Sequence, residues 1–172
     1  MLALATLLAC TGAVSTPAPE PAAPEVPEPP AAPVAPKDNL TKDADISGMS
    51  VDEKTAFLMK LGEKVYLTGM GGLPCVTCHG AEGKGMPGAF PPLVGQKDHM
   101  GDCAKHAGLV LDGMKGEIEV DGMKYNGVMV PQRAALNDLL IAAVITFERG
   151  SWGNDYGACL PEDVAKVREA TK

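Results

Sequence analysis

The sequence predicts an all-α fold for residues 40–172, interrupted by one small β-hairpin. Apolar residues recur at helical spacing over residues 51–68 and again over residues 138–149, near the two ends of this region. Between them, an Asp-Gly pair at 121–122 favours a two-residue hairpin turn, because both positions tolerate a positive φ. The length of 172 residues suits one folded domain.

The first expected helix begins after Ser50, because Ser50 and Glu53 have the spacing of a capping box. Gly62 lies in the middle of this helix, at a cost of about 1 kcal/mol relative to alanine. That cost indicates that another backbone passes close by. The helix ends at Gly69. Its inner side is expected to carry Phe57, Leu58, Leu61, Val65 and Tyr66.

The remaining elements follow from local signals. Glycine and proline dominate residues 80–95, which predicts a loop without regular structure. Residues 102–112 have a short helical pattern that ends at Gly113, and residues 117–125 form the expected hairpin. Asn137 can cap a helix that runs to Arg149, and Pro161 begins a last, charged helix.

The pentad Cys75-Val76-Thr77-Cys78-His79 is typical of the covalent attachment of a c-type haem. Its two thiols form thioethers with the vinyl groups of one macrocycle, and the histidine becomes the proximal iron ligand. A zinc site would need four ligands, and the chain has no second Cys-x-x-Cys. A redox dithiol would not require the histidine. The pentad therefore predicts one covalent haem c, whose flat apolar bulk suits a chain with only seven aromatic residues.

With these features, residues 50–172 resemble the class I cytochromes c. In that family a Gly-x-x-x-aromatic motif of the N-terminal helix, matched by Gly62 and Tyr66, crosses an aromatic residue of the C-terminal helix, matched by Phe147. The resemblance implies the class I cytochrome c fold, in which these two helices cross around one covalently bound haem, with the hairpin before an axial-methionine loop. It also implies that the carbonyl of Pro91 accepts the ring N–H of His79.

The sixth iron ligand is expected to be Met129. A thioether favours Fe(II), and Met129 follows His79 at about the distance seen in the family. Met86 lies too close to His79 in the chain to cross to the other haem face, while Met114 and Met123 remain alternatives.

Two histidines offer a different ligand set. His99 or His106 would give a bis-histidine iron with a lower potential. Both lie in polar segments beside lysine, so we expect them on the surface instead.

Cys103 and Cys159 remain once the other cysteines have roles. Export implies an oxidising compartment, so we expect one disulfide between them, with two unpaired thiols as the alternative. Trp152 is expected either to pack beneath the end of the C-terminal helix or to reach a haem propionate. Arg133 is expected either to meet a propionate or to lie in solvent.

The apolar run Leu2–Ala9, followed by Cys10, resembles the lipobox of bacterial lipoproteins. This resemblance implies a signal segment at residues 1–9, a lipid on Cys10 and a tether over residues 10–39. Nine prolines between 17 and 36 favour an extended spacer of about 60 Å. An ordinary signal peptide with an incidental Cys10 is the alternative. Thr11, where many inner-membrane lipoproteins carry aspartate, favours the outer membrane, with the domain on the periplasmic side.

The charge balance bears on partners. The chain carries a net charge of −7 without a basic block, which argues against nucleic acid. Residues 40–172 hold 18 acidic and 14 basic side chains, which favours redox partners with a basic or largely apolar face. We therefore expect an exported, lipid-anchored carrier of single electrons between respiratory proteins, with no catalytic residues. The alternatives are a haem enzyme or gas sensor with an open distal site, or a cytochrome subunit of a larger membrane complex.

Overall fold

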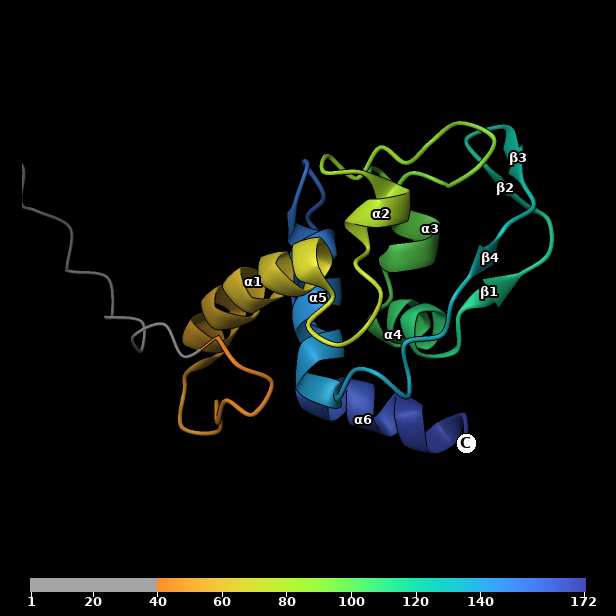
Figure 1. Ribbon diagram of the computed structural model, residues 1–172. Coiled ribbons are helices and arrows are strands. Elements are labelled where there is room, and N and C mark those ends of the chain that lie inside the picture. The colour runs from red at the N-terminus through yellow and green to blue at the C-terminus, as the bar shows by residue number, and fades with distance from the viewer. Residues whose placement is uncertain (1–39) are drawn as a thin grey trace, which may run out of the picture. The chain divides into compact units, whose positions relative to one another are not determined.

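The computed structural model describes residues 40–172 (Figure 1). The expected signal segment, Cys10 and the tether lie outside the described residues. Within the described range, the helices are α1 (Val51–Thr68), α2 (Val76–His79), α3 (Lys97–Met100), α4 (Cys103–Asp112), α5 (Asp138–Gly150) and α6 (Pro161–Ala170). The strands there are β1 (Met114–Lys115), β2 (Ile118–Val120), β3 (Met123–Tyr125) and β4 (Val128–Met129). The predicted mainly helical fold with a small hairpin is thus confirmed.

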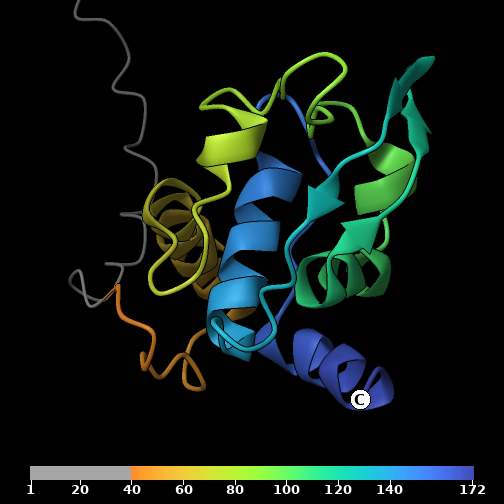
Figure 2. The ribbon, with the colours of Figure 1, turned by 45° about the vertical axis from the view of Figure 1, so that its right-hand side comes forward.

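Helix α5 forms the centre of this region, with α1, α4 and α6 packed against it (Figures 1 and 2). Its side chains from Leu140 to Ile145 are all buried, whereas α1 buries mainly one side. A helix buried around most of its circumference is a core helix, whereas one with a single apolar stripe covers it. The buried faces of α1, α4, α5 and α6 therefore make one hydrophobic core.

Gly62 lies where α1 crosses α5. A Cβ atom at this position would lie 2.1 Å from the carbonyl oxygen of Ala143 and 2.6 Å from the Cβ of Phe147. The expected close approach of a second backbone is therefore present. The capping box also forms, because the Ser50 hydroxyl accepts from the Glu53 amide and the Glu53 carboxylate accepts from the Ser50 amide.

The hairpin forms between β2 and β3, with Ile118 opposite Tyr125. Its turn has Asp121 at φ 52° and Gly122 at φ 75°, as the Asp-Gly pair predicts. A second antiparallel pair, β1 with β4, places Met114 opposite Met129. We did not expect this pair, because each of its strands has only two residues and no periodicity.

Cys103 and Cys159 are joined by a disulfide, with their Cα atoms 5.7 Å apart. The buried guanidinium of Arg149 joins the same two segments, because it donates to backbone carbonyls just before Cys103 and just before Cys159. Burial lowers the pKa of Arg149. The acceptors are the carbonyls of Met100, Gly101, Tyr156 and Gly157.

Trp152 packs against Tyr66 and Phe147, with ring centroids 5.3 and 5.4 Å apart. Of the two expectations for Trp152, packing beneath the helix end therefore holds.

Arg133 is half-buried rather than free in solvent, and its contact with a haem propionate stays a prediction. Arg133 donates to the Asp112 carboxylate at 2.8 Å and to the Arg168 carbonyl at 3.0 Å, so it links the end of α4 to the end of α6. None of the helices within residues 40–172 is both long and apolar enough to cross a membrane.

Candidate haem-binding site

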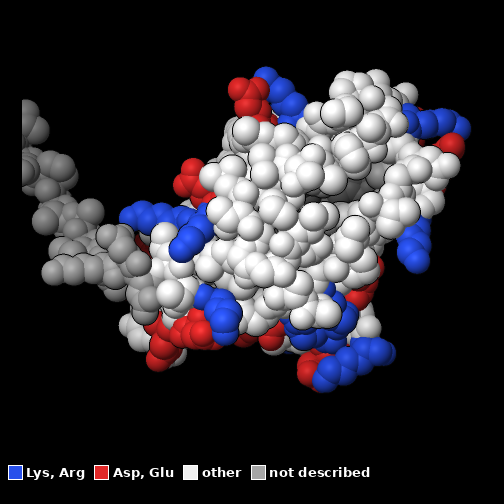
Figure 3. Space-filling model, viewed as in Figure 1, with Lys and Arg blue, Asp and Glu red and all other residues white. Residues whose placement is uncertain are grey.

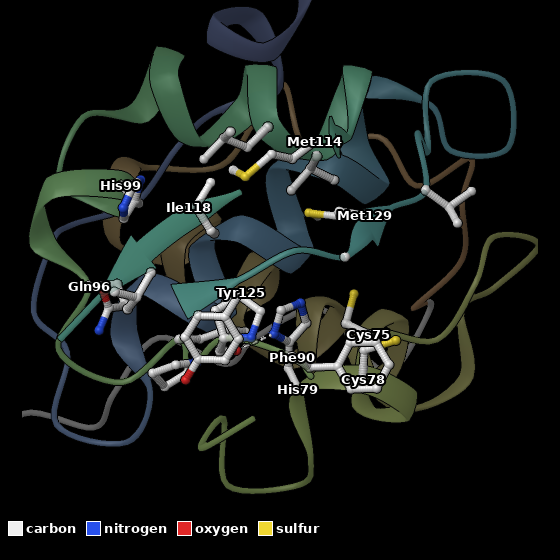
Figure 4. A pocket seen from close by; sticks show the side chains of 18 of the residues that line it. Cys75, Cys78, His79, Phe90, Gln96, His99, Met114, Ile118, Tyr125 and Met129 are labelled. Atoms are coloured by element: carbon white, nitrogen blue, oxygen red, sulfur yellow. Dashed lines mark hydrogen bonds between the residues drawn. The ribbon is translucent and has the colours of Figure 1, made fainter. Parts of the chain in front are cut away.

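A largely apolar pocket opens between α2, α4 and the strands (Figures 3 and 4). Its lining residues come from several segments between residues 73 and 148. These include Cys75, Cys78, His79, Pro91, Met100, His106, Met114, Tyr125, Met129 and Glu148. The structure therefore brings the pentad and the expected sixth ligand to one cavity.

One wall of the pocket is the short helix α2 with its preceding residue. The amides of Cys78 and His79 donate to the Cys75 carbonyl at 3.2 and 3.0 Å, and this turn directs all three side chains to the same cavity. The Nδ1 atom of His79 lies 2.9 Å from the carbonyl oxygen of Pro91. That bond orients the ring and leaves Nε2 free to bind iron.

The loop after His79 is held by its own backbone. The Gly85 amide donates to the His79 carbonyl at 2.9 Å, and the Leu93 amide donates to the Gly83 carbonyl at 2.7 Å. Gly85 has φ 64°, and a Cβ there would lie 2.3 Å from the carbonyl oxygen of Phe90. The loop therefore reaches the geometry that positions Pro91 only with glycine at this point.

Met129 lies across the pocket from His79 (Figure 4). The segment after it is fixed to α4, because the Gln132 amide donates to the Val110 carbonyl at 3.0 Å. Gly113 has φ 69°, and a Cβ there would lie 2.3 Å from the Met129 carbonyl oxygen. The turn at Gly113 thus lets β4 approach the end of α4.

Four other methionines bear on the choice of the sixth ligand. Met86 and Met123 do not line the pocket and are 57% and 41% exposed. Met114 and Met100 do line it, and Met100 was not among the residues that we singled out from the sequence. The sequence indicated the pocket position of Met100 only weakly, because this residue follows a polar segment and lies outside any long apolar pattern.

The expectation that His106 lies on the surface is wrong. Its side chain is 4% exposed and lines the pocket, with Nε2 3.0 Å from Oε2 of Glu148, which is also 4% exposed. His99 is half-buried and lines the pocket as well. The neighbouring lysine suggested a polar segment, but helical spacing from His106 to the buried Val110 already indicated an inward position.

Glu148, like Met100, is a pocket residue that sequence reasoning missed. Burial is the main cause that raises the pKa of the Cys75 thiol, and the negative charge of Glu148 is the second. The same two causes, in the same order, raise the pKa of Tyr66. The Tyr66 hydroxyl donates to the Gly80 carbonyl at 2.6 Å.

The donor set fits a haem c. Two thiols lie one helical turn apart beside an imidazole with one nitrogen already bonded, and thioether sulfurs lie elsewhere in the same apolar cavity. A flat macrocycle needs such apolar walls, and the pair of His106 and Glu148 interrupts them.

Comparison with known proteins agrees with this chemistry. The family model for cytochrome c matches residues 59–149. Cytochrome c-552 of Thermus thermophilus is 43% identical over 119 residues, which cover 62% of this chain and 83% of that protein. A second cytochrome c-552, from the DSM 579 strain of T. thermophilus, is also 43% identical, over 74% of its length. The chain therefore belongs to the cytochrome c family, as a mono-haem class I electron-transfer cytochrome with covalently bound haem c.

Proposed function

We propose that this protein carries single electrons, with haem attached to Cys75 and Cys78 and its iron held between His79 and Met129. The position of Met129 across the pocket from His79 is the observation that supports this function (Figure 4). The bound haem supplies an iron that alternates between Fe(III) and Fe(II). An imidazole and a thioether on opposite sides would leave no open position for a substrate or a gas.

Each residue has a distinct part in the proposal. The Pro91 carbonyl holds the His79 ring in one orientation and raises its basicity as a ligand. The thioethers at Cys75 and Cys78 keep the cofactor attached outside the cytoplasm. Met129 is favoured over Met114 because it lies across from His79 in the pocket, while Met114 is its partner on the neighbouring strand.

We propose that the mouth of the pocket is the docking surface. Leu73, Val128 and Val130 line the pocket and are 45%, 62% and 49% exposed. Figure 3 shows uncharged side chains around the hollow, with charged groups towards the periphery. An apolar partner face fits this surface better than a basic one, in a brief contact that buries less than about 1,200 Å².

Electron self-exchange tests this docking surface without a known partner. Because two copies must bring their haem edges together, Val128→Glu should slow self-exchange at low salt by charge repulsion. Leu67→Glu is the matched control, since Leu67 is 48% exposed but does not line the pocket. Equal slowing by both variants would contradict the proposal.

We further propose that the protein is exported and anchored by a lipid on Cys10, with residues 10–39 as the tether and residues 40–172 as the haem domain. Support comes from the lipobox-like run before Cys10, and from the Cys103–Cys159 disulfide, which suits an oxidising compartment. The outer membrane is favoured over the inner. Full-length protein should partition into membranes and Cys10→Ser should release it; equal partitioning of both would contradict the anchor.

Carbon monoxide binding and the far-red sulfur-to-iron absorption band test the iron ligation. The oxidised holoprotein should show that band, and the reduced holoprotein should not bind carbon monoxide rapidly at neutral pH. Met129→Ala should lose the band and bind carbon monoxide, because the sixth position opens. Met114→Ala is the control and should keep the band. Rapid carbon monoxide binding by the unaltered protein would instead indicate a haem enzyme or gas sensor.

A further inference from the structure

The buried pair of His106 and Glu148 is not used by the proposed carrier mechanism. Both side chains are 4% exposed, both line the pocket, and their Nε2 and Oε2 atoms are 3.0 Å apart. The Nδ1 atom of His106 is buried and has no hydrogen-bond partner among the described residues. Buried ionisable groups destabilise a fold unless they are fully paired, and this pair leaves one nitrogen unpaired.

The pair has two charge states that suit this geometry. With one proton shared between Nε2 and Oε2, it carries one negative charge. With a second proton on Nδ1, it is neutral overall. A buried site at low dielectric favours whichever state best balances the charge of its neighbours.

The charge of the haem changes by one unit during the proposed cycle. With two porphyrin charges, the core carries one positive charge as Fe(III) and none as Fe(II). The negative form of the pair therefore balances the oxidised haem, and the neutral form balances the reduced haem. This inference rests on the proposed function, because it requires a redox-active iron in the pocket.

We propose that His106 and Glu148 form a proton site coupled to the electron, which takes up one proton from water when the haem is reduced and releases it on oxidation. One electron arrives from the redox donor, and one proton arrives from solvent at Nδ1 of His106. Total charge in the pocket stays constant. The carrier thus moves a hydrogen equivalent, with the electron on iron and the proton on the pair.

Other titratable groups around the pair do not offer the same pairing. Tyr66 from α1 hydrogen-bonds to the Gly80 carbonyl, and the adjacent Arg149 guanidinium bonds to backbone carbonyls. Lys105 on α4 is exposed and donates to the Asp98 carbonyl. Helix α6 packs on the core through apolar side chains, and its Arg168 pairs with Asp138 of α5. Asp102 caps α4. The remaining titratable side chains that line the pocket are Cys75, Cys78, His79, His99 and Tyr125.

The midpoint potential of the holoprotein between about pH 5 and pH 8 tests the proposal. In the unaltered protein the midpoint potential should fall as the pH rises. The slope should approach about 59 mV per tenfold change in proton concentration, which is the limit for one proton per electron. Glu148→Gln keeps the side-chain size and removes the charge, so it should flatten this dependence. The double variant His106→Leu with Glu148→Leu should flatten it too. His99→Gln is the matched control and should retain the slope.

A direct measurement does not depend on any variant. Reduction of the oxidised holoprotein in weakly buffered solution with an indicator dye should consume protons. No proton uptake, or a potential independent of pH, would overturn the proposal, and so would a slope that survives in a folded double variant, since the haem propionates would then be its source. Failure of the proposed function looks different, because there would be no reversible iron couple to titrate.

Discussion

The two sides of the haem pocket hold their proposed iron ligands by different means. His79 lies in a helical turn of five consecutive residues and is oriented by a loop whose backbone–backbone hydrogen bonds stay within residues 76–94, with side-chain bonds added from Tyr66 and Asn154. Met129 lies in a two-residue strand that depends on β1 and on the end of α4. The proximal side is thus built by local sequence and the distal side by tertiary packing. Glycine substitutions that weaken the proximal side, the distal side or both can therefore distinguish the contributions of the two sides.

The largest effect should come from Gly62→Ala, which weakens the support beneath both sides. A methyl group 2.1 Å from the Ala143 carbonyl oxygen forces α1 and α5 apart. We expect a loss near the upper end of the about 1–3 kcal/mol typical of overpacking, measured by guanidinium unfolding of the holoprotein. Gly48→Ala is the control, because its Cβ would have no neighbour within 4 Å. Equal stability of the two variants would contradict the crossing.

Gly113→Ala should break the distal side alone. The new Cβ would lie 2.3 Å from the Met129 carbonyl oxygen and 2.9 Å from the Pro131 nitrogen, so β4 must move. We expect the far-red band to weaken and carbon monoxide binding to appear while the haem stays attached, with a loss of about 1–3 kcal/mol in stability. Gly116→Ala is the control, because Gly116 also has a positive φ but a Cβ there would meet nothing within 4 Å. If Gly116→Ala weakens the band equally, backbone strain rather than contact is the cause.

Gly85→Ala should perturb the proximal side alone. Its Cβ would lie 2.3 Å from the Phe90 carbonyl oxygen and 2.6 Å from that of Pro91, the acceptor for His79. The far-red band should persist, while the midpoint potential shifts because the His79 ring loses its fixed partner. Gly88→Ala, with a similar φ of 74° and no neighbour within 4 Å, should leave the potential unchanged. A lost band would mean that the two sides are not independent.

Asp112→Asn should have the smallest effect, at the end of the helix that supports the distal side. The Arg133 guanidinium lowers the pKa of the Asp112 carboxyl. A lowered pKa adds stability above the unfolded value of about 3.9, and this stability is lost as pH falls through the folded value. The melting temperature should therefore drop on substitution at pH 7, with a difference that shrinks below about pH 4. An unchanged difference in acid would contradict the pairing, and exposed Asp155→Asn serves as control.

The difference between the two sides also explains what the sequence could predict. The pentad, the capping box at Ser50, the crossing at Gly62 and the Asp-Gly hairpin each depend on residues close in the chain or on one steric demand. All four appear in the structure. The bond from His79 to Pro91 came from family resemblance and is also present.

What the sequence could not predict depends on distant partners. The pairing of β1 with β4 has too few residues to leave a pattern. His106 looked polar because of its neighbour Lys105, and its burial is intelligible only once Glu148 is opposite it. The ligand role of Met129, the lipid on Cys10 and the redox partners stay predictions.

Methionine methyl resonances of the reduced holoprotein most directly test the placement of iron between His79 and Met129. A methyl group bound next to the iron lies over the porphyrin ring, whose ring current moves its resonance far upfield. We expect one such methionine methyl, lost in Met129→Leu and retained in Met114→Leu. A spectrum without a shifted methionine methyl, or one in which it survives Met129→Leu, would contradict this ligation.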